Sequence, residues 1–362
     1  MAESDSRSGN RRSDRAGGDD TILDVRNASV SFDMDRGESR VLDTVDLAIE
    51  REEVIGVVGE SGSGKSMFAS ALLDAVVEPG ILTGEITYTP ASGEPVSVLE
   101  QDERALKQYR WEEVSMVFQG AMSSFNPTKK IRGHFVETIN AHDRDEESHM
   151  EGARDLLADL YLEPERVMDS YPHELSGGMK QRTLIALSLV LEPSVLVMDE
   201  PTAALDLLMQ RSILQLLDDI KRKYDLTIVF ITHDLPLVAE LADRLAVMYA
   251  FEFVEVAPTD EILYEAAHPY TRALLNVTPN IEAPVEDMQV IEGSSPDPVN
   301  VPSGCSYHPR CPLATAECRE ADPEYYTASP THEVKCHHWE DAAEAVPISQ
   351  QRGRERETGA QQ

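Results

Sequence analysis

The sequence predicts an α/β fold with a largely parallel sheet, an α-helical insertion and a small, loop-rich C-terminal extension. Short apolar runs alternate with helical patterns over most of the 362 residues, which is typical of such a sheet. A glycine-rich stretch, GESGSGKS, also stands between one of these runs and a predicted helix. At 41% hydrophobic residues, the chain can bury a sizeable core.

Four runs are predicted to be buried strands, because each is brief, apolar and followed by a polar loop. They cover residues 54–58, 195–198, 227–231 and 245–249. In a parallel sheet, functional groups gather at the carboxyl ends of the strands, so we expect the site there.

The chain divides by composition into four parts. Residues 1–20 and 343–362 are polar and predicted to be disordered tails. Residues 21–280 form the main domain, and its stretch from about 100 to 190 is predicted to be helical. There, Ala153, Leu156, Leu157 and Leu160 recur with the spacing of one helix face. A Pro-rich extension, residues 281–342, holds all four cysteines.

The charge balance limits the partners. With 66 acidic and 32 basic residues, the formal net charge is −34, which argues against nucleic acid. An acidic excess spread along the chain keeps a protein hydrated where salt screens its self-repulsion, so we predict adaptation to a high-salt cytoplasm. The sequence has no apolar run of roughly 18 residues and no signal-peptide core, so membrane association is expected only through a partner.

The glycine-rich stretch fits the pattern GxxxxGK[ST] of phosphate-binding loops, between a strand and a helix as that motif requires. Glycines let backbone N–H groups approach phosphates, and the helix N-terminus adds partial positive charge. Lys65 is expected to reach the β- and γ-phosphates, and Ser66 to hold Mg²⁺. The candidate ATP-binding residues are Gly59, Glu60, Ser61, Gly62, Ser63, Gly64, Lys65 and Ser66.

A second motif, SVLVMDEP, brings Asp199 and Glu200 to the end of a predicted strand. Asp199 is placed to bind Mg²⁺, directly or through water, and Glu200 to orient and polarise the attacking water. Two carboxylates after a strand more often form a solvated turn, but together with a phosphate loop they predict a nucleotide hydrolase.

Between these two motifs lies LSGGMKQR, residues 175–182, which resembles the signature sequence of ABC transporter ATPases. The resemblance implies a P-loop NTPase fold of the ABC nucleotide-binding type, with a mixed sheet core and an α-helical subdomain. It also implies that Ser176, Gly177 and Gly178 contact the γ-phosphate of ATP held by an opposite subunit. Gln181 of the same motif belongs to this predicted site.

Other short elements match the family in order. Phe32 stands where the family stacks an aromatic ring on adenine. Gln119 resembles the Q-loop residue, which would contact Mg²⁺ or the attacking water and couple to a membrane subunit. Ala204, Leu205 and Asp206 resemble the D-loop. His233 matches the switch histidine, which would hold the γ-phosphate and help to position the water.

Three departures from the family pattern are small. The D-loop has AALD where SALD is common, and Gly120 and Ala121 follow the Q-loop glutamine in place of an acidic residue and proline. Phe251 and Glu252 replace a glycine and a basic residue. Because Glu200 and His233 are present, we expect a catalytically competent site.

The C-terminal part indicates the branch of the family. HPYTRALL at 268–275, followed by PSGCSYHPRCPLATAEC and VKCH, resembles the extension of dipeptide and oligopeptide importer ATPases. The resemblance implies a motor using ATP and Mg²⁺ at the cytoplasmic face of the membrane. It implies a second ATPase subunit, favouring a heterodimer, together with two permease subunits and an extracytoplasmic binding protein.

Alternatives stay open at this stage. The cargo could instead be sugars or nickel complexes, and a DNA-repair or translation ATPase or a redox-sensing module are rival classes. Cys305, Cys311, Cys318 and Cys336 lie in one loop-rich segment that could close around a metal. The resemblance implies a [4Fe-4S] cluster. Zinc, or free or paired cysteines, are the alternatives, because spacing does not fix the metal and histidines stand nearby.

Overall fold

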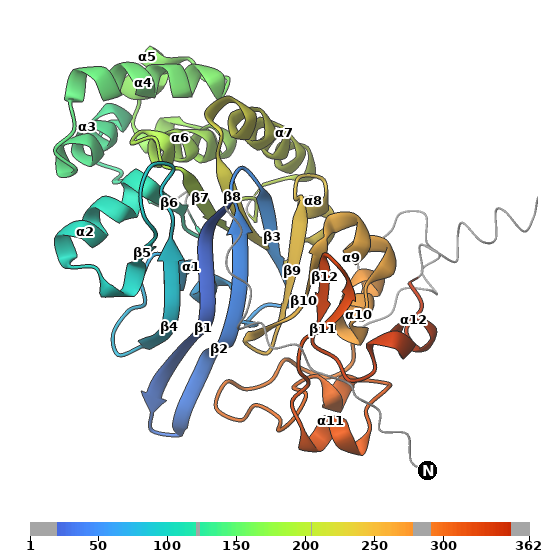
Figure 1. Cartoon of the computed structure of the whole chain (residues 1–362). Helices are drawn as coiled ribbons and strands as arrows, with labels where there is room; N and C mark the ends of the chain where they lie inside the picture. Colours follow the sequence, from blue (N-terminus) through green and yellow to red (C-terminus); the bar gives the residue numbers. More distant parts are fainter. Residues whose placement is uncertain (1–19, 121–123, 204, 278–290, 349–362) are drawn as a thin grey trace, which may run out of the picture.

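The computed structural model describes residues 20–120, 124–203, 205–277 and 291–348. Several sequence predictions fall outside these ranges: most of both tails, the domain boundary near residue 280, Ala121 and the D-loop residue Ala204. The other elements can be followed from blue to red in Figure 1.

The main sheet of the described residues has eight strands in the order β11-β12-β10-β9-β3-β8-β7-β6. The run from β9 to β6 is parallel, and β10 pairs antiparallel with β9. All four predicted strands lie in the parallel part, which confirms them. Their bounds are β3 (Val54–Val58), β7 (Val195–Asp199), β8 (Thr227–Thr232) and β9 (Arg244–Tyr249), with β6 at Val114–Val117.

A second, antiparallel sheet packs over the first. Its order is β2-β1-β4-β5, and the two long strands β1 (Thr21–Met34) and β2 (Gly37–Glu50) form most of it, with β4 (Ile81–Tyr88) and β5 (Val96–Ser97) at one side. The sheet of the fold is therefore mixed, as the family resemblance implies.

Both faces of the parallel sheet are covered, and the side chains of each strand alternate between two cores. In β3, Val54 and Val58 belong to one core with the helices, whereas Ile55 and Val57 belong to the other. That second core also holds side chains of β1, β2 and helix α1 (Lys65–Leu72), so α1 lies between the two sheets. Burial on both faces explains the continuous apolar sequence of these strands.

Helices α3, α4, α5 and α6, which precede β7 in sequence, form a group at one end of the molecule with α7 beside them, and α2 lies apart from this group (Figure 1). The predicted helix around residues 153–160 is confirmed as α4, where Ala153 and Leu157 are fully buried. The helix bounds here are α2 (Glu103–Gln108), α3 (Ile131–Ala141), α4 (Glu146–Asp159), α5 (Pro164–Asp169), α6 (Gly177–Leu189) and α7 (Leu207–Tyr224).

The C-terminal elements continue the main sheet. β10 (Glu252–Pro258) pairs with β12 (His332–Val334), and β12 pairs with β11 (Tyr326–Ser329). The remaining helices are α8 (Leu235–Ala239), α9 (Thr259–Glu265), α10 (Pro269–Val277), α11 (Ala316–Glu320) and α12 (Ala342–Ala345). In the part of the chain that the structure describes, no helix combines the length and apolar character needed to cross a bilayer.

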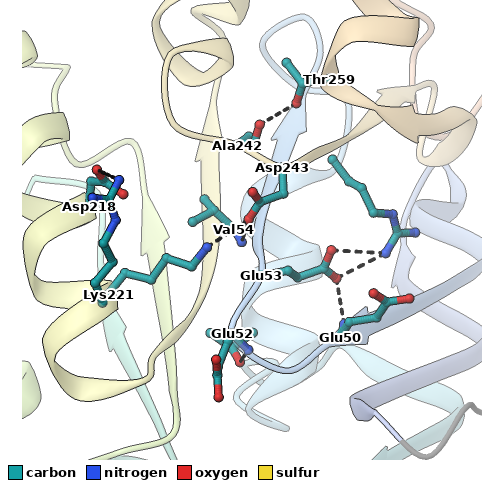
Figure 2. Close-up of polar contacts among 12 residues, drawn as sticks. Glu50, Glu52, Glu53, Val54, Asp218, Lys221, Ala242, Asp243 and Thr259 are labelled. Carbon is teal, nitrogen blue, oxygen red and sulfur yellow. Dashed lines mark hydrogen bonds and ion pairs between the residues drawn. The ribbon is translucent and has the colours of Figure 1, made fainter.

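A polar network fastens the amino ends of the parallel strands (Figure 2). The Glu53 carboxylate accepts a hydrogen bond from the Glu50 amide at 2.6 Å and pairs with Arg244 at 3.1 Å. The Asp243 carboxylate accepts from the Val54 amide at 2.8 Å and pairs with Lys221 of α7 at 2.9 Å. This network holds β3 at the end opposite the glycine-rich loop, so the loop leaves a fixed strand.

Candidate active site

The phosphate loop, residues 59–64, joins β3 to α1 in a conformation that requires glycine at two places. Gly59 has φ +156°, and a Cβ there would lie 2.1 Å from the Met248 carbonyl oxygen. Gly64 has φ +107°, and its Cβ would lie 2.7 Å from the carbonyl oxygen of Val41. The backbone of β9 and β2 therefore packs directly on the loop, which no larger residue would permit.

Lys65 opens α1 and turns its side chain back into the loop. Its Nζ donates to the carbonyl oxygens of Gly59 and Glu60, both at 2.8 Å. Burial lowers the pKa of Lys65, whereas the nearby carboxylates of Glu200 and Asp199 oppose this shift. The ammonium group is thus held inside the loop by two carbonyls, with the two carboxylates nearby, and it can attract a phosphate that enters the loop.

Asp199 ends β7 with a carboxylate that is almost fully buried. The residue is 4% exposed, and its Oδ1 is buried without a hydrogen-bond partner among the described residues. Burial raises the pKa of Asp199, and the interaction with the Ser66 side chain opposes that rise. An unpaired buried carboxylate oxygen beside a hydroxyl is a donor set that suits Mg²⁺.

Glu200 and His233 follow neighbouring strands and meet at their carboxyl ends. The His233 Nδ1 lies 2.8 Å and 2.9 Å from the two carboxylate oxygens of Glu200. Glu200 has φ +50°, and its amide donates to the Ile231 carbonyl at 2.9 Å. The His233 side chain is 62% exposed and that of Glu200 10%, so the imidazole is open to solvent whereas the carboxylate is largely buried.

The structure therefore brings Lys65, Ser66, Asp199, Glu200 and His233 together. The other predicted residues lie elsewhere. Gln119 is exposed after β6. Phe32 is half-buried on β1, where its ring lies beside Gly80. Asp206 caps α7 by accepting from the Met209 amide at 3.0 Å.

The signature residues belong to α6, in the helical group. The Ser176 hydroxyl accepts from the Met179 amide at 3.3 Å, so Ser176 caps the helix that Gly177 and Gly178 begin. Gln181 is 3% exposed, and its Nε2 has no hydrogen-bond partner among the described residues. A capped helix N-terminus with two glycines suits an anion approaching from outside the chain.

Two residues that support the phosphate loop were not predicted from the sequence. The Tyr270 hydroxyl of α10 accepts a hydrogen bond from the Glu60 amide at 2.9 Å. The Phe251 amide, in the turn between β9 and β10, donates to the Ser63 carbonyl at 2.9 Å. Tyr270 lies in HPYTRALL, which in the sequence indicates only the branch of the family, and Phe251 is one of the small departures from the family pattern.

The four cysteines lie near one another in the extension, and all are free of disulfides. Burial raises the pKa of Cys305 and of Cys336 to about 12, and neighbouring thiols add to both shifts. Even so, within the described ranges no three or more His, Cys, Asp or Glu side chains form a group that could hold a metal ion. The structure gives neither the zinc nor the iron–sulfur interpretation any support.

Two family models match the sequence. One, described as ABC transporter, matches residues 42–203, which include the phosphate loop and both carboxylates. The other, described as Oligopeptide/dipeptide transporter, C-terminal region, matches residues 254–318 and so contains Tyr270.

Among curated relatives, the dipeptide transport ATP-binding protein DppD of Caldanaerobacter subterraneus subsp. tengcongensis is 39% identical over 323 residues. The match covers 88% of this chain and 98% of that protein. The oligopeptide transport ATP-binding protein OppD of Escherichia coli is 37% identical, over 84% of this chain and 89% of that protein.

Among solved structures, the dimeric structure of a bacterial ABC transporter cassette has a TM-score of 0.57 and 25% identity. It covers 66% of this chain and 99% of that chain. A post-hydrolysis state of the same cassette, bound to ADP and Pi, matches equally well. Sequence, fold and site agree, and the chain belongs to the ABC transporter family as an ATP-hydrolysing subunit with a C-terminal region of the oligopeptide/dipeptide transporter type.

Proposed function

We propose that this chain is the motor subunit of an ABC importer that takes up dipeptides or oligopeptides across the cytoplasmic membrane. The observation that carries the proposal is the direct contact between the two matched regions. Tyr270, from the oligopeptide/dipeptide transporter region, accepts a hydrogen bond from Glu60 of the phosphate loop. The region that matches the oligopeptide/dipeptide transporter model thus contacts the phosphate loop directly.

In the proposed reaction, the amides of Gly59 to Gly64 and the Lys65 ammonium bind the ATP phosphates. Ser66, Asp199 and Gln119 would hold Mg²⁺, which neutralises phosphate charge when bound. Glu200 orients and polarises the attacking water, and His233 holds the γ-phosphate. The 2.8 Å contact between His233 Nδ1 and the Glu200 carboxylate supports these two roles, because it orients the carboxylate.

A second ATPase subunit completes the proposed site. Ser176, Gly177, Gly178 and Gln181 would contact ATP held by the partner, while Phe32 stacks on adenine and Asp206 lies at the interface. The Nε2 of Gln181, which has no hydrogen-bond partner in the described part of the chain, and the capped start of α6 support an anion at this helix end. We favour a heterodimer, which ATP binding closes and hydrolysis reopens.

The chain is proposed to act at the cytoplasmic face of the membrane with two permease subunits, while an extracytoplasmic binding protein delivers cargo. Import of sugars or nickel complexes is the second reading. The relatives named for dipeptide and oligopeptide transport support the peptide reading over that one.

Two finer predictions remain. The acidic excess of 34 charges is proposed to reflect a high-salt cytoplasm.

A [4Fe-4S] cluster on the four cysteines stays a prediction. It requires purified protein to contain about four iron atoms per chain, with a broad visible absorption that is lost when Cys336 is replaced by serine.

The experiment is uptake by the reconstituted transporter. The chain is purified from membranes with its co-purifying subunits, incorporated into liposomes, and supplied with Mg-ATP, the co-purifying binding protein and a labelled tripeptide. We expect ATP-dependent accumulation that unlabelled dipeptides or oligopeptides inhibit and that vesicles containing Glu200→Gln lack. Accumulation of Ni²⁺ or a sugar without peptide uptake would overturn the peptide assignment. Co-purification with ribosomes or DNA and no permease would overturn the transport assignment.

A further inference from the structure

Glu60, the first variable residue of the phosphate loop, directs its side chain at the C-terminal extension. Its carboxylate forms a two-point ion pair with Arg310, at 2.7 Å to Nη1 and 3.0 Å to Nη2. The Ser295 hydroxyl donates to the same carboxylate at 3.2 Å. A residue 250 positions later in the chain therefore fixes the position of a carboxylate of the phosphate loop.

The Arg310 side chain is also held in place by contacts other than its ion pair with Glu60. Its Nε donates to the Glu292 carbonyl at 2.8 Å, and its guanidinium lies 5.7 Å from the centre of the Tyr249 ring. The Arg310 side chain is 6% exposed, whereas that of Glu60 is 25% exposed. A buried, planar guanidinium held on several sides presents its two N–H groups to a carboxylate at little entropic cost.

The segment that carries Arg310 also braces the loop backbone. Tyr307, three residues earlier, packs its ring on Tyr249 at 5.1 Å and on Tyr270 at 5.4 Å. Tyr270 in turn accepts the Glu60 amide hydrogen bond. The stretch between Cys305 and Cys311 therefore supports Glu60 at both its side chain and its main chain.

The charge of Glu60 makes this contact relevant to ATP. The Glu60 carbonyl accepts a hydrogen bond from Lys65 Nζ at 2.8 Å, so Glu60 adjoins the group that binds phosphate. A free carboxylate there would repel a triphosphate carrying about four negative charges, and the repulsion is strong where water is scarce. Neutralisation by Arg310 removes that penalty.

We propose that Arg310 is a positioning residue for ATP binding: it holds and neutralises the Glu60 carboxylate, and so sets the ATP affinity of the phosphate loop from within the C-terminal extension. The inference concerns the affinity for ATP. It does not depend on the cargo or on any metal bound by the cysteines.

The experiment is a double-mutant cycle on the full chain with its co-purifying subunits. The forms are wild type, Arg310→Met, Glu60→Gln and the double variant, and KM for Mg-ATP, kcat and the equilibrium Kd for ATP are measured. We expect Arg310→Met to raise KM and Kd about tenfold with kcat at saturating ATP nearly unchanged. Because Glu60→Gln removes the repelling charge, the double variant should recover most of the lost affinity.

The recovery separates the proposal from a merely structural role. If Arg310 only stabilised the fold, its contacts with Glu292 and Tyr249 would be lost in both Met variants, and Glu60→Gln would rescue nothing. Arg319→Met, an exposed charge removal on the same extension, is the matched control and should leave KM unchanged. The defect of Arg310→Met should also shrink as KCl is raised, since salt screens the carboxylate.

Arg310→Lys provides a further test in case the Met variants do not fold. It keeps the positive charge but cannot form the two-point pair, so we expect a KM rise smaller than about fivefold. Wild-type Kd in Arg310→Met, no rescue by Glu60→Gln, or a loss of kcat with unchanged KM would each overturn the proposal. If the Met variants do not fold, a KM rise of about fivefold or more in Arg310→Lys would also overturn the proposal.

Discussion

At the scale of single residues, the position of Glu200 depends on an unfavourable backbone conformation. A positive φ costs a residue with a Cβ about 1 kcal/mol, and Glu200 has φ +50°. Its amide hydrogen bond to Ile231 and its contact with His233 compensate for that cost. The conformation turns the carboxylate out of the strand direction toward the place where the γ-phosphate is proposed to lie.

We predict that Glu200→Gln lowers kcat by a factor of about 10² to 10⁴, the usual contribution of a positioned base, and retains ATP binding. The amide keeps the shape and cannot polarise water as a carboxylate does. ATPase rate and ATP Kd check this, with Glu240→Gln, an exposed acidic residue paired with Arg211, as the unaffected control. Wild-type turnover in Glu200→Gln would move the catalytic role to another group.

At the scale of elements, the C-terminal region attaches through β10, β12 and the start of α10. The buried Glu255 carboxylate of β10 accepts from the His268 amide at 3.1 Å and lies 2.7 Å from His332 Nε2. His268 itself accepts from the Tyr270 amide at 3.0 Å through Nδ1. One buried carboxylate and one neutral imidazole therefore set the orientation of Tyr270 beneath the phosphate loop.

We predict that this attachment weakens in acid because of His268. Burial lowers the pKa of His268 to about 4, although Glu255 opposes the shift and Lys335 adds to it. In the unfolded chain, the His268 imidazole takes up a proton below about pH 6.5, whereas in the folded chain it does so only near pH 4. Stability from this group is thus complete above pH 6.5 and falls by about 3 kcal/mol on the way to pH 4.

Thermal unfolding at a series of pH values between those limits measures the effect. The variant His268→Asn keeps an acceptor for the Tyr270 amide, and its side chain does not titrate. Its Tm should start from a lower value at pH 7 than that of the wild type. Because no imidazole is protonated, its Tm should then fall less steeply toward pH 4. Parallel Tm profiles of the two proteins would show that His268 does not govern the acid transition.

The elements that the sequence predicted are those whose signal is local. β3, β7, β8 and β9 were predicted because burial on both faces makes each a continuous apolar run. The sequence predicts a helix after the glycine-rich loop, and this helix, α1, ends at Leu72 because the chain turns at Asp74 with φ +47°. The pairing of β12 with β10 joins short segments about 80 residues apart, and no periodicity indicates it.

The site was predictable to a similar extent. Lys65, Asp199, Glu200 and His233 follow strands in recognisable motifs, and the structure brings them together. Arg310 and Tyr270 contact the phosphate loop only in the folded chain. In the sequence, Arg310 stands directly before Cys311, and the cysteines of that segment indicate metal binding rather than a contact with the loop. Long-range ion pairs leave no spacing pattern, so only the three-dimensional arrangement reveals them.

At the scale of the whole molecule, the formal net charge of −34 acts on the folded chain as a distributed self-repulsion. Screening lengths fall from about 10 Å at 0.1 M salt to about 3 Å at 1 M. We therefore predict that Tm rises by about 5 °C or more between about 0.1 M and 2 M KCl, a shift that corresponds to about 2 kcal/mol.

Neutralising exposed charge should have the same direction of effect. Glu151 and Asp155 lie four residues apart on the exposed side of α4, where like charges repel. The variant Glu151→Gln/Asp155→Asn should have a higher Tm than wild type in low salt and about the same Tm in high salt. A wild-type Tm that is flat or falling with KCl would show that charge screening does not control the stability of this chain.

The Glu60–Arg310 pair has a practical consequence for anyone who recombines members of this family. A chimera that takes residues 1–277 from this chain and its extension from a relative would combine Glu60 of one protein with position 310 of another. The two side chains would form the ion pair only if the relative also has a suitable residue there. Such grafts should work only when the residues at positions 60 and 310 are transferred together. The ATPase domain and its C-terminal region are therefore better treated as one inherited unit than as interchangeable modules.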